Sequence, residues 1–302
     1  MFEIIDDKKV AIIAAAILLV SGCFAFYEKI LTPKEITGID PKAELWNELH
    51  LEAEAVAIYD IKEQKFLFEK NSEIQLPLAS LTKIMTAYVV RKNLPEDKII
   101  AVSAKSTKRE GDSGLRAGEH YSLRDLLRLT LVRSSNDGAS AAALAFEQEN
   151  NLLPQSFIEK MNDEARELGL LQTYFMNEDG LDYASSTSGG YGSAKDVALL
   201  TTYALNEYPE VFGATAYPSI TVSSLEKRHI EGRNTNKAIG AIPGLIAGKT
   251  GYTDLSDGNL VVIFDVGPEH PVAAVVLGSS FDGRFTDIEK LVQVILRSIA
   301  LD

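Results

Sequence analysis

The sequence predicts an α+β fold, in which an antiparallel sheet is built from the N- and C-terminal segments of a domain and a helical subdomain is inserted between them. Short apolar or aromatic runs typical of strands occur early, at residues 53–59 and 65–69, and again late, at residues 248–252, 260–266 and 272–277. The residues between these two groups show helical spacing and helix caps instead. Strands at both ends with helices between them indicate one sheet shared by the two ends.

The first elements follow from local signals. Residues 60–64 are polar and separate the first two apolar runs, which predicts a β-hairpin. The apolar run that follows Ser80 predicts a helix beginning near that residue. Ser122 and Asp125 have the spacing of a capping box, which predicts the start of a helix over residues 123–132.

Further helices and strands complete the expected domain. Gly169 is a helix stop signal, and Ser193 is a helix cap. The remaining expected elements are helices at 139–149, 157–168, 194–206 and 285–300, extended pieces at 172–177 and 219–223, and a loop rich in Gly and Ser at 185–192.

An apolar segment precedes the domain. Residues 10–27 carry no charge, follow Lys8 and Lys9, and are long enough for a short membrane helix. Two interpretations remain open: an uncleaved anchor with its lysines on the cytoplasmic side, or a lipoprotein signal in which Cys23 is acylated and becomes the new N-terminus. The apolar residues at 24–27 favour the anchor, because a mature lipoprotein usually becomes polar after its cysteine.

Both interpretations hold the rest of the chain at a membrane, outside the cytoplasm. We therefore expect a membrane anchor or signal segment at 1–30, a linker at 31–51 and one domain at 52–302. A chain of 302 residues, 46% of them hydrophobic, is long enough to bury the core of one large domain.

Composition excludes several classes of function. The net charge is −13 and no basic stripe occurs, which argues against nucleic-acid binding. Cys23 is the single cysteine, so the expected domain contains neither a disulfide nor a thiolate nucleophile. The four histidines lack ligand spacing, so we expect neither a metal site nor a cofactor; they are His50, His120, His229 and His270.

Ser80 and Lys83 form the first candidate catalytic pair. Three residues apart on a helix, they lie one turn apart on the same face. A hydroxyl becomes an effective nucleophile when a neighbour takes its proton, and a desolvated lysine can do so. The spacing alone is weak evidence, because Ser224 and Lys227 repeat it.

Two further motifs carry polar groups suited to a substrate. Ser134 and Asn136 lie two residues apart at a turn between predicted helices, so both can face one point. Lys249 and Thr250 stand between two glycines at the start of a predicted strand and can hold an anion. This stretch also resembles the end of a nucleotide-binding P-loop, but Pro243 stands where that loop requires glycine, and a strand follows instead of a helix.

The three motifs occur in the order Ser80-x-x-Lys83, Ser134-x-Asn136 and Lys249-Thr250-Gly251, which is far more specific than any of them alone. With this combination the chain resembles the low-molecular-mass penicillin-binding proteins, the serine D-alanyl-D-alanine carboxypeptidases. The resemblance implies a β-lactamase/transpeptidase-like fold that acts on peptidoglycan stem peptides and is acylated by β-lactam antibiotics. It runs from about Glu52 to the C-terminus and includes residues 79–87, 131–137, 161–162, 168–173, 179–181 and 248–253.

The resemblance implies roles for the first two motifs. Ser80 is then the nucleophile that forms an acyl-enzyme with the penultimate D-Ala, and Lys83 is the general base for that attack. Ser134 passes the proton towards the nitrogen of the leaving D-Ala. Asn136 fixes Lys83 and the substrate amide.

The resemblance also implies a carboxylate site and an oxyanion hole. Lys249 and Thr250 are expected to bind the terminal carboxylate of the peptide. The backbone N–H groups of Ser80 and Tyr252 are expected to surround the oxygen on which negative charge develops. Arg284 is a candidate for a second carboxylate contact, and an ordinary surface arginine at a helix start is the open alternative.

The negative net charge of the chain adds an electrostatic expectation. An anionic peptide end must approach an acidic protein, so positive groups must gather in the cleft. We hypothesise that Lys83 and Lys249 lie close together and lower each other's pKa, which favours a neutral amine at Lys83.

Two other functions share the nucleophile motif. A class A β-lactamase requires a glutamate in a Glu-x-x-Leu-Asn loop, and the sequence has no such string. Glu178 lies in the corresponding region, but its surroundings at 177–181 match the carboxypeptidase pattern. A sensor or scaffold that is acylated without turnover has the same motifs and stays open, as do the choice between carboxypeptidase and endopeptidase and the chemistry of the stem peptide.

Overall fold

The computed structural model describes residues 45–46, 49–111, 113–153 and 156–299. The chain divides into two units, residues 1–47 and 48–302, and everything below concerns the second unit. The expected anchor or signal segment at 1–30 lies outside the described residues, as does most of the expected linker at 31–51. Among the residues that are described, none of the helices combines the length and the apolar character that a membrane crossing requires.

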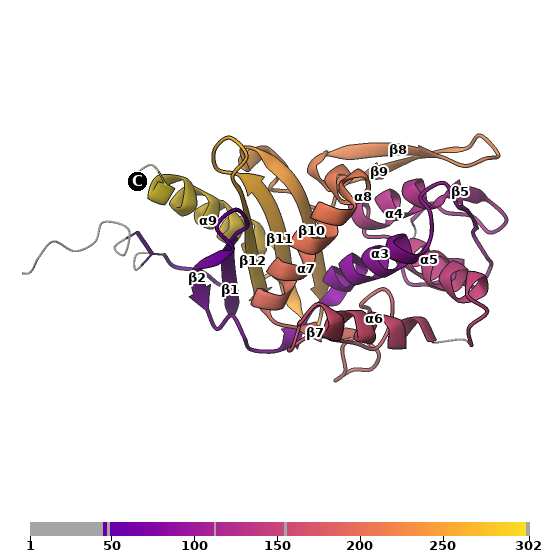
Figure 1. Ribbon diagram of the computed structural model, residues 1–302, viewed down its shortest axis with the longest axis horizontal. Coiled ribbons are helices and arrows are strands. Elements are labelled where there is room, and N and C mark those ends of the chain that lie inside the picture. Colours follow the sequence, from indigo (N-terminus) through magenta and orange to yellow (C-terminus); the bar gives the residue numbers. More distant parts are fainter. Residues whose placement is uncertain (1–44, 47–48, 112, 154–155, 300–302) are drawn as a thin grey trace, which may run out of the picture. The chain divides into compact units, whose positions relative to one another are not determined.

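A five-stranded antiparallel sheet joins the two ends of the domain, as the sequence predicts (Figure 1). The early hairpin pairs with the last strand of the chain, so that β1 lies between β12 and β2. The strand order is β10 (Leu245–Thr253), β11 (Asp257–Asp265), β12 (Pro271–Ser279), β1 (Ala55–Asp60) and β2 (Lys65–Lys70).

The inserted region consists mainly of helices, also as predicted. Their starts are set by the predicted caps, since the Ser122 side chain accepts from the Asp125 N–H and the Ser193 side chain accepts from the Asp196 N–H. The helices are α3 (Thr82–Asn93), α4 (Leu123–Val132), α5 (Asn136–Glu149), α6 (Ser156–Glu167), α7 (Ala194–Glu207) and α8 (Pro209–Phe212), and α9 (Gly283–Ile299) follows the last strand.

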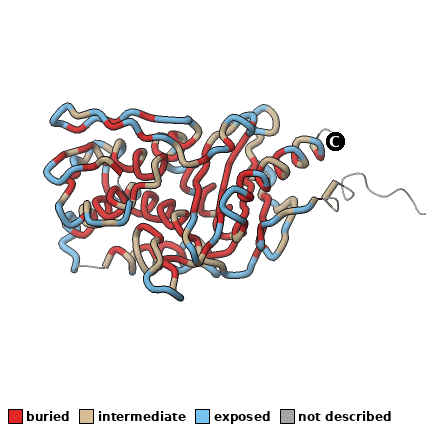
Figure 2. The backbone as a smooth tube through the Cα atoms, turned by 180° about the vertical axis from the view of Figure 1, so that it is seen from behind, coloured by how far each residue is buried: buried red, intermediate tan, exposed pale blue. Residues whose placement is uncertain are grey.

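The central sheet is covered on both faces, which explains the nearly continuous apolar runs of its strands. Val275 and Leu277 belong to a core cluster that also contains residues of α3, α4, α5 and α7. Ala274 and Val276 are equally buried, and because side chains alternate along a strand they face the opposite side, where α9 packs on β11 and β12. Figure 2 shows the buried residues running through the sheet and the adjoining helices.

Small sheets apart from the central sheet were only partly predicted. The expected strand at 219–223 is β8 (Ser219–Ser223), but its hairpin partner β9 (His229–Arg233) was missed. The turn between them contains Ser224, whose N–H donates to the Arg228 carbonyl at 2.9 Å. Ser224 and Lys227 therefore lie in a hairpin turn and not one helical turn apart, which removes them as a rival nucleophile pair.

Five shorter strands complete the described strands. The pair β4 (Ile99–Ala101) and β5 (His120–Ser122) was not expected. The extended piece expected at 172–177 contains the two-residue strand β6 (Tyr174–Phe175), and the expected loop ends in β7 (Gly190–Gly192), which pairs with β6 and with β3 (Leu76–Pro77). This small sheet fixes the chain just before Ser80.

Asp287 ties α9 to the start and the end of the sheet. Its side chain is 0% exposed. One carboxylate oxygen accepts from the Ala53 N–H at 2.8 Å and from the Ser279 hydroxyl at 2.9 Å, and the other accepts from the Glu52 N–H at 3.2 Å. The single carboxylate thus satisfies three donors from two segments, one before β1 and one at the end of β12.

We expect Asp287→Ala to lower the free energy of unfolding by about 2–4 kcal/mol, because it leaves the buried Ala53 N–H without an acceptor. Urea unfolding of the domain measures this. Thr286→Ala is the matched control, since Thr286 is the exposed neighbour on the same helix. Equal stability of the two variants would contradict the role assigned to Asp287.

Candidate active site

Ser80 and Lys83 meet as the sequence predicts. The Lys83 Nζ donates to the Ser80 Oγ at 2.8 Å, and the Lys83 side chain is 0% exposed whereas Ser80 is half-buried. Ser80 lies in the short 3₁₀ helix η1 (Ala79–Leu81), immediately before α3, and it does not cap the α-helix. The hydroxyl therefore stays accessible while the amine that can take its proton is kept from water.

The segment around Ser80 is held in an unusual conformation between two glycines. Ala79 has a φ of +47°, which lies in the left-handed region that residues with a side chain rarely adopt. A Cβ on Gly180 would lie 1.9 Å from the Ala79 carbonyl oxygen, and a Cβ on Gly251 would lie 2.7 Å from the Leu78 carbonyl oxygen. Only glycine at both positions lets the turn at 177–181 and strand β10 approach the nucleophile so closely.

The second and third motifs also meet. The Lys249 Nζ donates to the Ser134 Oγ and to the Thr250 carbonyl, each at 2.8 Å. Ser134 lies between α4 and α5 with a φ of +58°, and Ser135 caps α5 by accepting from the Gly138 N–H. Lys249 is 3% exposed, so a second amine is withdrawn from water beside the first.

Thr250 is the other predicted carboxylate ligand. It is buried on β10, and its hydroxyl lies 2.6 Å from the hydroxyl of Thr235. Thr235 was not singled out from the sequence, because it belongs to none of the three motifs. Its hydroxyl can fix the orientation of the Thr250 hydroxyl and thereby the direction in which Thr250 donates.

Asn136 differs from the expectation. Its Nδ2 donates to the Glu110 carbonyl at 2.6 Å, and its Oδ1 is buried without a hydrogen-bond partner. The Lys83 amine donates instead to the Asp179 carbonyl at 2.5 Å. The expected hydrogen bond between Asn136 and Lys83 is therefore absent from the described residues, and a backbone carbonyl takes that place. The free Oδ1 remains suited to a substrate N–H.

Burial governs the protonation of both lysines. It lowers the pKa of Lys83 to about 8, from an ordinary 10.5, because the ammonium loses its hydration. The pKa of Lys249 falls well below its ordinary range, first through burial and then through the positive charges of Lys83 and Arg284. The expected repulsion between the two lysines therefore lowers the pKa of Lys249, whereas the pKa of Lys83 is lowered mainly by burial and to a smaller extent by the charge of Arg109.

Arg284 is buried, so the surface alternative is wrong. It is 4% exposed near the start of α9, and its Nη1 donates to the Gly251 carbonyl at 2.5 Å. Its guanidinium lies 4.7 Å from the ring centre of Phe281 and 5.8 Å from that of Tyr252. Arg284 thus holds β10 through the Gly251 carbonyl and adds positive charge near Lys249. A direct contact between Arg284 and the carboxylate of the substrate stays a prediction.

Tyr252 follows Gly251 on β10. Because Gly251 brings β10 against the segment that carries Ser80, the backbone of Tyr252 and the backbone of Ser80 come from the two segments in contact. The oxyanion hole formed by their N–H groups stays a prediction. The Tyr252 side chain is 43% exposed and packs edge-on against Phe281, with 4.9 Å between the ring centres.

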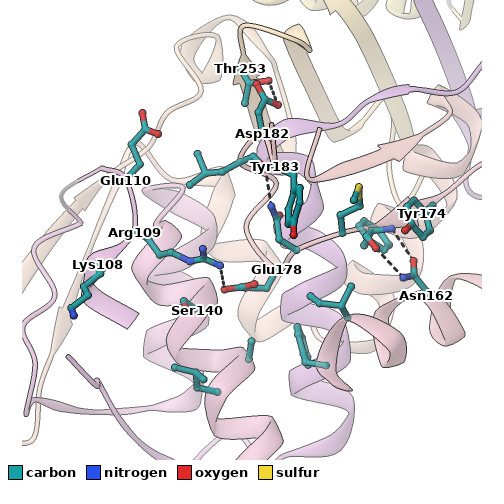
Figure 3. A pocket seen from close by; sticks show the side chains of 18 of the residues that line it. Lys108, Arg109, Glu110, Ser140, Asn162, Tyr174, Glu178, Asp182, Tyr183 and Thr253 are labelled. Atoms are coloured by element: carbon teal, nitrogen blue, oxygen red, sulfur yellow. Dashed lines mark hydrogen bonds and ion pairs between the residues drawn. The ribbon is translucent and has the colours of Figure 1, made fainter. Parts of the chain in front are cut away.

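A polar cavity of about 1120 Å³ adjoins this end of β10 (Figure 3). Thr253 and Asp182 meet at its upper edge, where the Thr253 hydroxyl donates to the Asp182 carboxylate at 3.0 Å. The other walls come from the segment at 105–110, the loop at 174–183 and helices α5 and α6. The cavity can receive an extended polar chain that leads away from Ser80.

Sequence reasoning missed Arg109, which pairs with charged groups next to Lys83. The side chains of Arg109 and Glu178 form an ion pair in the cavity (Figure 3), and the Glu178 carbonyl accepts from the Thr86 hydroxyl at 2.6 Å. Asp179 lies in the stretch 179–181, which is part of the family resemblance. The basic stretch before Glu110 contains no motif that would have identified Arg109. Among the described residues, no cluster of three or more His, Cys, Asp or Glu side chains is placed to hold a metal ion.

Comparison with known proteins agrees with this geometry. A family model described as D-alanyl-D-alanine carboxypeptidase matches residues 42–280. The D-alanyl-D-alanine carboxypeptidase DacC of Escherichia coli is 32% identical over 257 residues, which cover 80% of this chain and 60% of the relative. A D-alanyl-D-alanine endopeptidase of Pseudomonas aeruginosa is 32% identical over 251 residues, which cover 82% of this chain and 77% of the relative.

A solved structure supports the same relationship. Penicillin-binding protein D2 of Listeria monocytogenes, in its ampicillin-bound form, is 29% identical with a TM-score of 0.67, covering 82% of this chain and 98% of that one. The chain spans about 60% of the length of the Escherichia coli carboxypeptidase. Because the family model covers most of the sequence and the three motifs lie close together, the chain belongs to the D-alanyl-D-alanine carboxypeptidase family.

Proposed function

We propose that the protein is a serine D-Ala-D-Ala carboxypeptidase that removes the terminal D-Ala from peptidoglycan stem peptides. The observation that carries the proposal is the 2.8 Å hydrogen bond between the Ser80 hydroxyl and the fully buried Lys83 amine. The 2.8 Å contact between Lys249 and Ser134 supports it, since it supplies a second hydroxyl and a cation beside the first pair.

Acylation follows from these positions. The terminal carboxylate of the peptide binds Lys249 and Thr250, and its negative charge favours the ammonium form of Lys249. Neutral Lys83 takes the proton of Ser80 as the hydroxyl oxygen attacks the carbonyl carbon of the penultimate D-Ala. The oxygen of the tetrahedral intermediate becomes negative and accepts from the N–H groups of Ser80 and Tyr252.

The intermediate then collapses and the enzyme is regenerated. The C–N bond breaks, and the leaving D-Ala nitrogen receives the proton that Lys83 took from Ser80, passed on through the Ser134 hydroxyl, which Lys249 holds in place. Water next attacks the ester carbonyl, and Lys83, neutral again, takes a proton from that water. The Ser80–carbonyl bond breaks, Lys83 returns its proton to the Ser80 oxygen, and the shortened peptide leaves with a new carboxylate.

The cavity beside β10 supplies room for the upstream part of the substrate. It begins at Tyr252, the residue proposed for the oxyanion hole, and continues past Thr253, so we assign it to the part of the peptide that stays attached to Ser80. Its walls carry both acids and bases, which suits the amine and carboxylate groups of a stem peptide.

The same chemistry explains acylation by penicillin. A β-lactam presents a strained amide and a carboxylate, so its ring carbonyl can take the place of the D-Ala carbonyl at Ser80. The related Listeria monocytogenes protein was solved with ampicillin bound. A stable adduct with benzylpenicillin, together with D-Ala release, supports the carboxypeptidase; rapid hydrolysis of the drug indicates a β-lactamase, and a stable adduct without D-Ala release indicates a sensor.

We further propose that the enzyme works at the outer face of the bacterial cell membrane. The support is the uncharged apolar run at 10–27 with Lys8 and Lys9 before it. In a bacterial host we expect the full chain in the membrane fraction and a variant without residues 1–30 outside it. Loss of a lipid label in Cys23→Ala distinguishes a lipoprotein from an anchor, and cytosolic full-length protein contradicts both.

We expect Ser80→Ala and Lys83→Ala each to reduce D-Ala release from a stem-peptide mimic by at least about a thousandfold, because nucleophile and base act as a unit. Labelling with a fluorescent penicillin, measured in parallel, should disappear in Ser80→Ala. Ser224→Ala and Lys227→Ala serve as matched controls, because Ser224 and Lys227 have the same spacing as Ser80 and Lys83 but lie in a hairpin turn. Equal loss in the controls would overturn the assignment.

The rate of acylation by benzylpenicillin should rise with pH and level off near pH 8. Below its lowered pKa of about 8, Lys83 is mostly an ammonium and cannot take a proton, so the rate should fall about tenfold per pH unit. A lysine of ordinary pKa would place the plateau above pH 10. A flat profile from pH 5 to pH 9 would refute the neutral-base mechanism.

A further inference from the structure

The base of this site has two carboxyl groups as close neighbours, which is a problem for its chemistry. Lys83 donates to the backbone carbonyl of Asp179, and Glu178 precedes Asp179 in the same turn. An ammonium that pairs with a nearby carboxylate is stabilised in its charged form. An ion pair between Lys83 and the carboxylate of Asp179 or Glu178 would keep the Lys83 amine protonated and unable to accept the proton of Ser80.

The structure shows both carboxylates turned to other partners. The Asp179 side chain is 0% exposed; one oxygen accepts from the Leu181 N–H at 3.0 Å and the other lies 3.1 Å from the Arg109 Nε, in an ion pair. Glu178 pairs with the Nη2 of the same Arg109 (Figure 3). One guanidinium therefore engages both carboxylates, and only the backbone of Asp179 is left to Lys83.

We propose that Arg109 is a positioning residue that draws the Asp179 and Glu178 carboxylates away from Lys83, so that Lys83 meets Ser80 as a free amine. This inference rests on the proposed function and adds a residue to it. Arg109 comes from the segment before α4 and is 34% exposed at the cavity wall, so it approaches Lys83 from an element that none of the three motifs contains.

The charges around Lys83 agree with this arrangement. Asp179 and Glu178 raise the pKa of Lys83 and Arg109 lowers it, while burial is the largest cause of its low value. Burial raises the pKa of Asp179, and the positive charges of Lys83 and Arg109 oppose that rise and favour the ionised carboxylate. Two further charged groups face this cluster: Lys249 faces Lys83 from β10, and Asp137 faces Arg109 from α5.

The proposal predicts shifts of opposite sign for the two partners of one ion pair. Arg109→Met removes the competing cation and should move the midpoint of the pH–acylation profile upward by about one pH unit. Asp179→Asn removes the carboxylate but keeps an oxygen for the Leu181 N–H, and should move the midpoint downward. The double variant should return towards the wild type, and Arg109→Lys should lie closer to the wild type than Arg109→Met.

The experiment measures the second-order rate of acylation by benzylpenicillin from pH 5 to pH 10 in the full chain, with D-Ala release from a stem-peptide mimic in parallel. Arg91→Met is the matched control, because Arg91 lies on the same helix as Lys83 and forms an ion pair, 2.9 Å long, with Glu210, which is not one of the carboxylates next to Lys83. A purely structural role for Arg109 would lower rates or stability without moving the midpoint in opposite directions.

The outcomes separate this inference from the function on which it rests. A wild-type protein that is neither acylated at Ser80 nor active on the mimic overturns the proposed function. Suppose instead that the acylation rate of the wild type rises with pH, but the midpoints of Arg109→Met and Asp179→Asn stay in place or move in the same direction. That result overturns the role of Arg109 alone.

Discussion

The exclusion of water from two neighbouring amines is the constraint on which the site depends. An ammonium group in a protein interior loses several kcal/mol of hydration unless nearby groups replace it, so burial favours the neutral form. Lys83 and Lys249 are both almost fully buried, and each still donates to a hydroxyl and to a backbone carbonyl. The hydroxyls are thus oriented by the same contacts that satisfy the amines.

Backbone geometry, more than side-chain chemistry, brings these groups together. Ala79 and Ser134 both have positive φ values and lie beside the hydroxyls of the first two motifs, where strain of about 1–3 kcal/mol each is tolerated only because surrounding structure fixes the chain. The turn at 177–181 and strand β10 supply that support to Ala79 from two sides, through contacts that glycine alone permits, and the Lys249 amine donates to the Ser134 hydroxyl from β10. The rigid sheet therefore fixes the positions of the serines in the helical subdomain.

Much of this arrangement could be predicted from the sequence, for identifiable reasons. Alternating and continuous apolar runs revealed the five-stranded sheet, and Ser122 and Ser193 marked helix starts because their caps are local. The meeting of Lys83 with Ser80 follows from one helical turn. That Lys249 and Ser134 belong to one site does not follow from spacing and was implied by the family resemblance, and their direct hydrogen bond was not predicted. Arg109 remained invisible because an ion pair between residues about 70 positions apart leaves no local pattern.

The joining of β1 to β12 has a consequence for synthesis of the chain. These neighbouring strands are separated by about 200 residues, and β10, which carries Lys249, is made shortly before β12. A nascent chain leaving the ribosome cannot close the sheet until its last quarter has emerged, and such long-range pairing is slow. A chain that ends before β10 would lack Lys249, Thr250 and the strand that lies against the segment carrying Ser80, so we expect such a chain not to assemble the proposed site.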